Sequence, residues 1–480
     1  MSVSVGWYEV TILSMLEIPP PAAKIYAPNS NKNINNKKDI NLTIFTYIMT
    51  LYTDKIISII DYNKTMKLIT SNKKVVLLML LIIFYIAIRS IHFENYLNFS
   101  SEQASFSLEA LRIWRAKSIE FIGPPISLRM GARYLFQGSI TYYFMIPFLI
   151  FGKLDPVNSS YLFMIFGAFS VIPLFYGTRL LTNEKVAIIM VILFSFFPLY
   201  IDYSRFFWNP TAQFILTPYL VLLLGIYEKY NKRLMLILIG MMMGLLLLFH
   251  YQFALTIVGV LFYYLFFKKI SLLKFANIFI GLLIGVSPMI IFELRNNFYN
   301  TQTLLLFTQN KSQVFEDKFS FVYTMHYYLS GSLFLFTIIL YKLRKLLNTA
   351  LIGLFILIIV IFSLIKYSKL PSHGFGMAKD WNIMMEKKTY KIIKQQNITN
   401  YNIVNLGYDT VSTVQKYLHE VDGKSFNYND YYQNKYLYVI SEEEEFMGNP
   451  AYEVNTFKPS VVVDKWPINT RYKLYLLRKI

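Results

Sequence analysis

The chain of 480 residues is 55% hydrophobic and 18% aromatic, and it carries a formal net charge of +19 at pH 7. Apolar runs of roughly 16 to 22 residues recur along it, as in membrane proteins, and small basic clusters between the runs indicate topology signals rather than nucleic-acid patches. Because there is no cysteine, disulfides, thiolate catalysis and cysteine-ligated metals are excluded, and the five histidines lack zinc-binding spacing.

Residues 1–65 differ in composition from the rest of the chain. A proline triplet at 19–21 and an Asn/Lys-rich run at 29–41 lack the apolar content of a core, so we expect a disordered N-terminal extension. Met66 opens a short basic lead into the first apolar run and is a candidate start of translation. This lead has no cleavage site of small residues, and we therefore expect an uncleaved first helix.

Nine apolar runs predict membrane-spanning helices in a domain of residues 66–370. They are 75–91, 160–181, 186–202, 211–227, 234–250, 253–267, 275–293, 321–341 and 347–367. A further stretch, 139–153, reaches only about 22 Å against a hydrocarbon core of roughly 30 Å and contains Pro147. If this stretch lies along the outer face, every inner loop is basic, whereas if it crosses, four basic clusters become external. We therefore predict nine spans, with the N-terminus inside and residues 371–480 outside.

The first external loop opens with an acidic residue. Ser100-x-x-Gln103 fits a capping box, which places Glu102 in the first turn of an amphipathic helix on the outer membrane surface. The alternative for Glu102 is a favourable interaction with the positive end of that helix, worth only ~0.3–1 kcal/mol.

The predicted topology gathers other polar residues on the same outer side. They are Arg112, Arg129, Arg133, Arg205, His250, Gln252, Glu293, Arg295 and Asn296. Ionisable groups at helix ends that face a common cavity indicate a functional site. The alternative is that Arg205, His250 and Arg295 only mark the water interface where the spans end.

Several stretches resemble a known family. A first span is followed by an acidic residue that opens an amphipathic helix, and then by the stretches FIGPPIS, FQGSITYYFMIPFLIFG and LDPV. In these features the chain resembles the GT-C membrane glycosyltransferases of the polyprenyl-phosphate type, family 39 in the broad sense. This group includes the protein O-mannosyltransferases and the lipid A aminoarabinose transferase, and the resemblance covers about residues 66–370. It implies that Glu102 is the key carboxylate, although the family usually has Asp there, and that Gln137 begins the counterpart of a His-x-Pro-like motif.

The chemistry of a lipid-linked sugar phosphate assigns roles to these residues. We expect Glu102 to activate an acceptor hydroxyl as general base, and Arg205 and Arg295 to pair with the anionic phosphate. Donor hydrogen bonds are expected from His250 and Gln252, for which a structural role is the alternative. Supporting positions are Gln103, Gln137, Glu293 and Asn296. One carboxylate is too few ligands to specify a metal, so no metal site is predicted and help from a divalent metal stays open.

The polar C-terminal part predicts a small α/β domain. Its elements are a helix at 380–396, a strand at 401–407, a helix at 410–420 and strands at 435–441 and 472–478. It contains no catalytic constellation, and we expect a structural cap outside the membrane.

The sequence therefore predicts a polytopic α-helical membrane protein with a small C-terminal α/β domain. Its expected activity is that of a cell-membrane glycosyltransferase, which moves a sugar from a polyprenyl-phosphate donor to an extracytoplasmic protein, lipid or cell-envelope glycan. One alternative is a transporter or flippase of lipid-linked sugars, although the internal repeats and midplane charges typical of transporters are not seen. A second is an inactive relative that only binds an isoprenoid phosphate.

Overall fold

The computed structural model describes residues 72–130, 133–309, 325–344, 349–428 and 430–480. The expected extension 1–65 and Met66 lie outside these residues, as does the side chain of Arg129. Helix α5 (Asn72–Ser90) begins in one unit of the chain, residues 17–83, and ends in a second unit that includes residues 84–480. The description below concerns this second unit.

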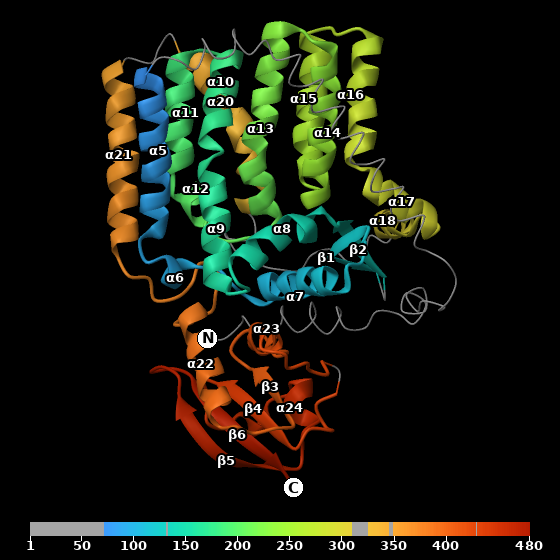
Figure 1. The fold of residues 1–480 in the computed structure, drawn as a ribbon, viewed down its shortest axis with the longest axis vertical. Helices are drawn as coiled ribbons and strands as arrows, with labels where there is room; N and C mark the ends of the chain where they lie inside the picture. The colour runs from blue at the N-terminus through green and yellow to red at the C-terminus, as the bar shows by residue number, and fades with distance from the viewer. Residues whose placement is uncertain (1–71, 131–132, 310–324, 345–348, 429) are drawn as a thin grey trace. The chain divides into compact units, whose positions relative to one another are not determined.

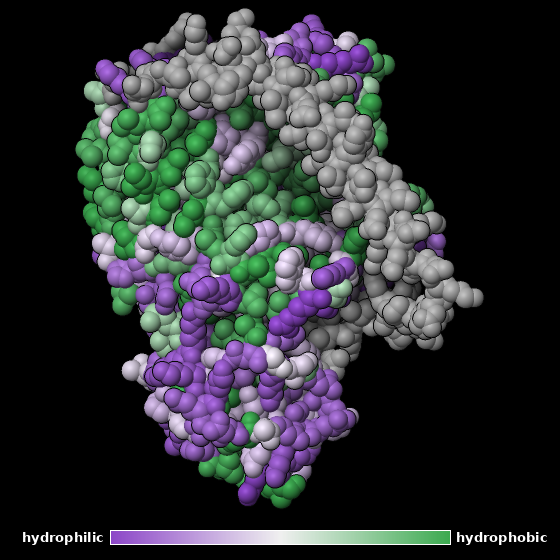
Figure 2. Space-filling view, viewed as in Figure 1, coloured by the Kyte–Doolittle hydropathy of each residue, from purple (hydrophilic) through white to green (hydrophobic). Residues whose placement is uncertain are grey.

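Apolar helices make up most of the chain before residue 370. They are α9 (Pro156–Ala168), α10 (Val171–Leu181), α11 (Glu184–Phe196), α12 (Pro198–Tyr203), α13 (Asn209–Tyr230), α14 (Arg233–Phe249), α15 (Phe253–Phe262), α16 (Leu272–Gly285), α17 (Ser287–Arg295), α18 (Tyr299–Gln309), α20 (Leu329–Leu343) and α21 (Thr349–Ser368). A π-helical turn, Tyr263–Phe267, continues α15. Hydrophobic residues cover these helices on the face shown in Figure 2, and hydrophilic residues cover the C-terminal domain.

The prediction of nine spans is wrong by the length and composition of the helices. Within the described residues, three helices are long and apolar enough to cross a membrane: Pro156–Leu181, Asn209–Tyr230 and Ala350–Ser368. A fourth is obtained if α16 and α17, which are bent by 63° at their junction, form one span. These four correspond to four of the predicted runs.

The other predicted spans fail for identifiable reasons. The run 186–202 is divided at Phe197, where the backbone is extended and Pro198 starts a new helix, α12. Helix α14 has 17 residues and rises only about 25 Å, and α15 with its π-helical turn has 15. Helix α20 also has 15 residues, although residues 321–324 of the predicted run 321–341 lie outside the described residues. Helix α5 is 19 residues long, but it contains Lys73, Lys74 and Arg89. Apolar composition alone does not reveal where a helix breaks.

The stretch 139–153 forms a short helix, α8 (Ile140–Phe151), with Pro147 inside it. Its 12 residues fall short of a span, as predicted from its length. Helix α8 packs against α7 (Ser101–Ala116), and Figure 1 shows both helices running across the ends of the long helices. A hairpin of β1 (Ile122–Met130) and β2 (Arg133–Gly138) connects them. The short helix α6 (Phe93–Tyr96) precedes α7.

Helices α14 and α16 approach each other closely through small residues. A Cβ atom added at Gly240 would lie 1.9 Å from the carbonyl oxygen of Ile278, and one added at Gly281 would lie 2.0 Å from that of Ile237. Glycine at these positions lets the two backbones touch, which is a common basis of helix packing in membranes.

Gly281→Val is therefore expected to separate α14 from α16 and to destabilise the protein by roughly 1–3 kcal/mol or more, because the new side chain meets backbone atoms. The measurement is the thermal unfolding midpoint of the purified protein in detergent. Gly353→Val is the matched control, since no described atom outside the local helix backbone lies within 4 Å of a Cβ placed there. Equal midpoints for the two variants would contradict the close packing.

The C-terminal part folds as an α/β domain, as expected. Five elements match the predicted ones: helix α22 (Ile383–Gln395), β3 (Tyr401–Asn405), α23 (Thr413–Val421), β4 (Tyr436–Ser441) and β6 (Lys473–Lys479). Two further elements are α24 (Tyr452–Asn455) and β5 (Ser460–Pro467). The strand order is β3-β4-β6-β5, with β3 parallel to β4 and the other neighbours antiparallel. Strand β5 is mostly exposed at the sheet edge, so it lacks the buried apolar pattern that identified the other strands.

Candidate functional site

The N-terminus of α7 holds Glu102 as the sequence predicts. Ser100 is the N-cap residue: its backbone N–H donates to Gln103 Oε1 at 3.1 Å, and its hydroxyl donates to the same oxygen at 2.7 Å. Gln103 is buried and acts as the reciprocal half of the cap. Glu102 follows in the first turn of α7, where the residue as a whole is half-buried.

The carboxyl group of Glu102 accepts a hydrogen bond from the side chain of Trp208. Burial raises the pKa of Glu102 to about 7, and the hydrogen bond from Trp208 opposes this change by stabilising the charged form. A carboxyl group that exchanges its proton near neutral pH has the property required of a general base.

Aromatic rings extend from Trp208 to two histidines. The ring centroid of Trp208 lies 4.7 Å from that of His326, and the His326 centroid lies 5.2 Å from that of His250. Tyr327 contacts both histidine rings and is 45% exposed. These residues come from the loop before α13, the end of α14 and the turn before α20, so tertiary packing brings together segments far apart in the chain.

Four amide side chains, here called the amide cluster, adjoin these rings: Gln137, Asn209, Gln213 and Gln252. Asn209 donates to Gln137 Oε1, and Gln213 donates at 2.8 Å to the carbonyls of both Leu246 and His250. Gln252 donates to Gln213 Oε1 at 3.3 Å and to the His326 carbonyl at 3.0 Å.

Two side-chain oxygens of the amide cluster accept no hydrogen bond from the described residues. Asn209 Oδ1 and Gln252 Oε1 are enclosed and have no hydrogen-bond partner among the described residues. Buried acceptors without a donor are costly, so both atoms can accept a hydrogen bond from water or from a bound molecule.

Arg205 occupies a buried position beside the same loop. Its Nε donates to the Arg89 carbonyl at 3.2 Å, and its Nη2 donates to the carbonyls of Ile88 at 3.1 Å and Ile91 at 3.4 Å. The guanidinium lies over the rings of Tyr96 and Tyr367, at 4.5 and 4.4 Å from their centroids. Arg205 thus satisfies carbonyls at the end of α5, and only its Nη1 has no hydrogen-bond partner among the described residues. Its predicted role in phosphate binding stays a prediction.

The residues at the end of α17 contact neighbouring parts of the chain, and their predicted roles toward a ligand stay predictions. Glu293 accepts from the backbone N–H groups of Asn300 at 2.9 Å and Thr301 at 3.0 Å, and so it caps α18. Arg295 is exposed, with its guanidinium 5.2 Å from the ring centroid of Phe121, and Asn296 donates to the Phe292 carbonyl at 2.8 Å.

This region is connected to Gln137 through one strand. Asn300 exchanges two hydrogen bonds of 3.0 Å with the backbone of Phe136, the residue before Gln137. Glu293 therefore supports the strand that carries Gln137, whereas the described contacts of Arg295 do not include Glu102 or the amide cluster.

Sequence reasoning missed several residues of this arrangement. Trp208 and Asn209 follow Arg205 by three and four residues. Gln213 is a polar residue inside an apolar helix, which is itself a signal of function. His326 carried no signal, because nothing in its local sequence points to His250. Among the described residues, no three His, Asp or Glu side chains are placed to hold a metal ion, so the geometry adds no ligands to Glu102.

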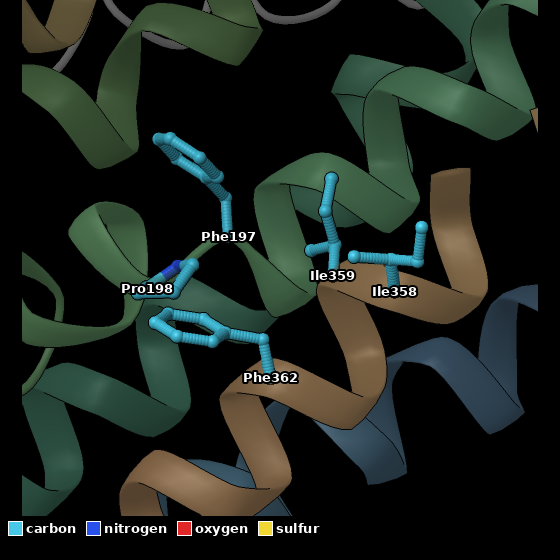
Figure 3. A pocket seen from close by; sticks show the side chains of 5 residues that line it. All are labelled: Phe197, Pro198, Ile358, Ile359 and Phe362. Carbon is cyan, nitrogen blue, oxygen red and sulfur yellow. The ribbon is translucent and has the colours of Figure 1, made fainter. Parts of the chain in front are cut away.

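An apolar hollow of about 320 Å³ lies at the break between α11 and α12. Its lining is made by Phe197, Pro198, Ile358, Ile359 and Phe362, and Figure 3 shows the residues of the break facing those of α21. Ile358 and Phe362 are more than half exposed, so the hollow opens at the surface of α21. The six residues of α12 separate it from the loop that carries Arg205 and Trp208.

Trp208→Phe is expected to raise the pKa of Glu102 above about 7, because the charged carboxylate loses its hydrogen-bond donor while burial is kept. The measurement is an infrared titration of the carboxyl band, with the spectrum of the Glu102→Gln variant subtracted. Trp114→Phe is the control, since Trp114 is an exposed residue of α7, the helix that carries Glu102. A midpoint that falls or stays unchanged in Trp208→Phe would contradict the hydrogen bond.

Comparisons with protein-family models, curated proteins and solved structures find no match to this chain. The family resemblance therefore stays a prediction that rests on its sequence motifs.

Proposed function

We propose that the protein is an integral-membrane glycosyltransferase that moves a sugar from a polyprenyl-phosphate donor to an acceptor outside the cytoplasm. The observation that carries the proposal is the carboxyl group of Glu102, whose pKa is raised to about 7 and which accepts a hydrogen bond from Trp208. Trp208 in turn adjoins the ring of His326 and directly precedes Asn209 of the amide cluster. Each part of this arrangement corresponds to one requirement of sugar transfer.

Glu102 serves as the general base in this proposal. Near neutral pH a fraction of the carboxyl groups is ionised and able to take the proton of an acceptor hydroxyl as that oxygen attacks the anomeric carbon. The bond between the anomeric carbon and the phosphate oxygen breaks, and the polyprenyl phosphate leaves with the electron pair. The Trp208 hydrogen bond holds the carboxylate in one orientation.

The amide cluster and the rings suit a sugar. Asn209 Oδ1 and Gln252 Oε1 are acceptors without donors among the described residues, and sugar hydroxyls supply donors. The exposed ring of Tyr327 provides a surface against which the C–H groups of a sugar ring pack. In this proposal, Arg205 Nη1 and the exposed Arg295 remain the candidates for contact with the phosphate.

The apolar hollow suits the polyprenyl chain. It has an apolar lining, opens at the exposed face of a candidate span, and lies one short helix from the loop of Trp208. A lipid tail in this hollow would place its phosphate toward that loop. The proposal puts this end of the helices, and the C-terminal domain with it, on the extracytoplasmic side of the membrane.

Glu102→Gln is expected to lower transfer by roughly 10²–10⁴-fold, because glutamine keeps the shape of the side chain but accepts no proton. Purified protein is incubated with a panel of polyprenyl-phosphate sugars and an acceptor-containing membrane extract, and free carrier release is measured against pH. Wild-type activity is expected to rise with pH through about 7, as Glu102 ionises. Carrier release that is equal in the two proteins would overturn the general-base role, and no release from any donor would overturn the proposed function.

Ile358→Trp is expected to weaken donor binding about tenfold, because the indole fills the hollow that the lipid chain would occupy. The measurement is the dissociation constant of a fluorescent polyprenyl phosphate. Leu357→Trp is the control, since Leu357 is also exposed on α21 but does not line the hollow. If both variants bind the lipid as the wild type does, the chain binds elsewhere.

A further inference from the structure

The C-terminal domain contacts the segment that leads into α7. Tyr417 of α23 is fully buried, with its ring centroid 5.5 Å from that of Phe99, and its hydroxyl donates to the Leu154 carbonyl at 2.7 Å. Phe99 directly precedes Ser100, the N-cap residue of the helix that carries Glu102. Tyr417 is therefore held between the start of α7 and the loop between α8 and α9.

The same domain also reaches the loop of Trp208. The ring centroid of Phe375 lies 5.2 Å from that of Tyr203 and 6.1 Å from that of Phe206. The ring of Phe206 in turn stacks on Trp208 at 6.3 Å. Phe375 and Tyr417 thus contact the two segments whose side chains meet in the Glu102–Trp208 hydrogen bond.

Polar contacts fix the domain in this place. The backbone N–H of Phe375 donates to the Tyr96 carbonyl at 3.1 Å, and Lys387 forms an ion pair of 2.7 Å with Asp155. Asp155 uses its other carboxylate oxygen to cap α9, accepting from Val157 and Asn158 at 2.9 Å. The domain is therefore attached at the start of α7 and at the start of α9.

We propose that docking of the C-terminal domain positions Glu102, with Tyr417 and Phe375 as the positioning residues. Tyr417 covers Phe99 at the entry to α7, and Phe375 covers Phe206 beside Trp208, so the carboxyl group and its donor are held together and shielded from water. The catalytic meaning of this inference rests on the proposed function, whereas the docking itself does not.

The physical consequence concerns water at Glu102. Burial is the largest cause of the raised pKa of this carboxyl group, so removal of the covering rings lets water in and lowers the pKa from about 7 toward its ordinary value. A domain that only added stability would change the amount of folded protein but leave this midpoint alone.

The test is the infrared titration of Glu102 in the full-length protein, with subtraction of Glu102→Gln. Tyr417→Ala, Phe375→Ala and the double variant are expected to lower the midpoint, by about one pH unit or more in the double variant. The kcat for sugar transfer should fall roughly 10–100-fold with an unchanged KM for the donor, because the base is misplaced while the donor site is kept. Tyr432→Ala, at an exposed tyrosine of the same domain, is the control.

A wild-type midpoint in the folded double variant would overturn the inference. Tyr417 is not a member of the two apolar clusters at the sheet of the domain, and folding of each variant is checked by circular dichroism. If the double variant still fails to fold, Lys387→Glu tests the same docking through repulsion of Asp155. It should lower the midpoint, and added Asp155→Asn, which keeps the α9 cap, should restore it, whereas an unchanged midpoint would overturn the inference.

This titration separates the inference from the proposed function. A lowered midpoint in a protein that transfers no sugar supports the docking effect and refutes the glycosyltransferase. An unchanged midpoint of the Glu102 titration in a variant that transfers sugar refutes the docking effect and supports the glycosyltransferase.

Discussion

The arrangement depends on the satisfaction of buried carbonyl groups at the end of α5. The last carbonyls of a helix have no partner within it, and away from water they need another donor. Arg205 donates to those of Ile88, Arg89 and Ile91, while Arg89 itself reaches the Ser204 hydroxyl at 2.6 Å and the Ser195 carbonyl at 2.7 Å. These crossed bonds fix the loop after α12. Trp208 and Asn209, which follow three and four residues later, are placed beside Glu102 and Gln137 as a result.

A second group of charges secures the same region from the other side. Asp202 accepts from Lys366 and from the Tyr367 hydroxyl, both at 2.7 Å, which joins α12 to the end of α21. The ring of Tyr367 also lies against the Arg205 guanidinium. Asp202 and Arg205 are buried, and buried charged groups are costly unless they are paired and hydrogen-bonded. Arg205, which the sequence predicts to bind phosphate, is thus also the residue that fixes the loop after α12 against the end of α5.

Much of the fold follows from local sequence, and much of the site does not. The cap at Ser100, the short helix α8 and five elements of the C-terminal domain follow from capping residues, length and apolar periodicity. The breaks at Phe197 and Val286 do not, since proline within an apolar run is compatible with a continuous span as well as with a broken one. Arg205 donates to backbone carbonyls, and Glu293 accepts mainly from backbone N–H groups. No sequence pattern distinguishes such backbone partners from the groups of a ligand. Gln137, His250 and Gln252 were identified from their positions, but only the folded chain shows that Asn209, Gln213 and His326 connect them.

The central claim is that the Trp208 loop and the start of α7 meet, so that a sugar site forms around Glu102. Because the natural chain has no cysteine, this juxtaposition is directly measurable by introducing cysteines at 102 and 208 and treating membranes with a short thiol-to-thiol cross-linker. The account predicts an efficient intramolecular cross-link in the double variant and none in either single variant. If both thiols react with a monofunctional reagent and yet no cross-link forms, the two segments do not meet and the proposed site is contradicted.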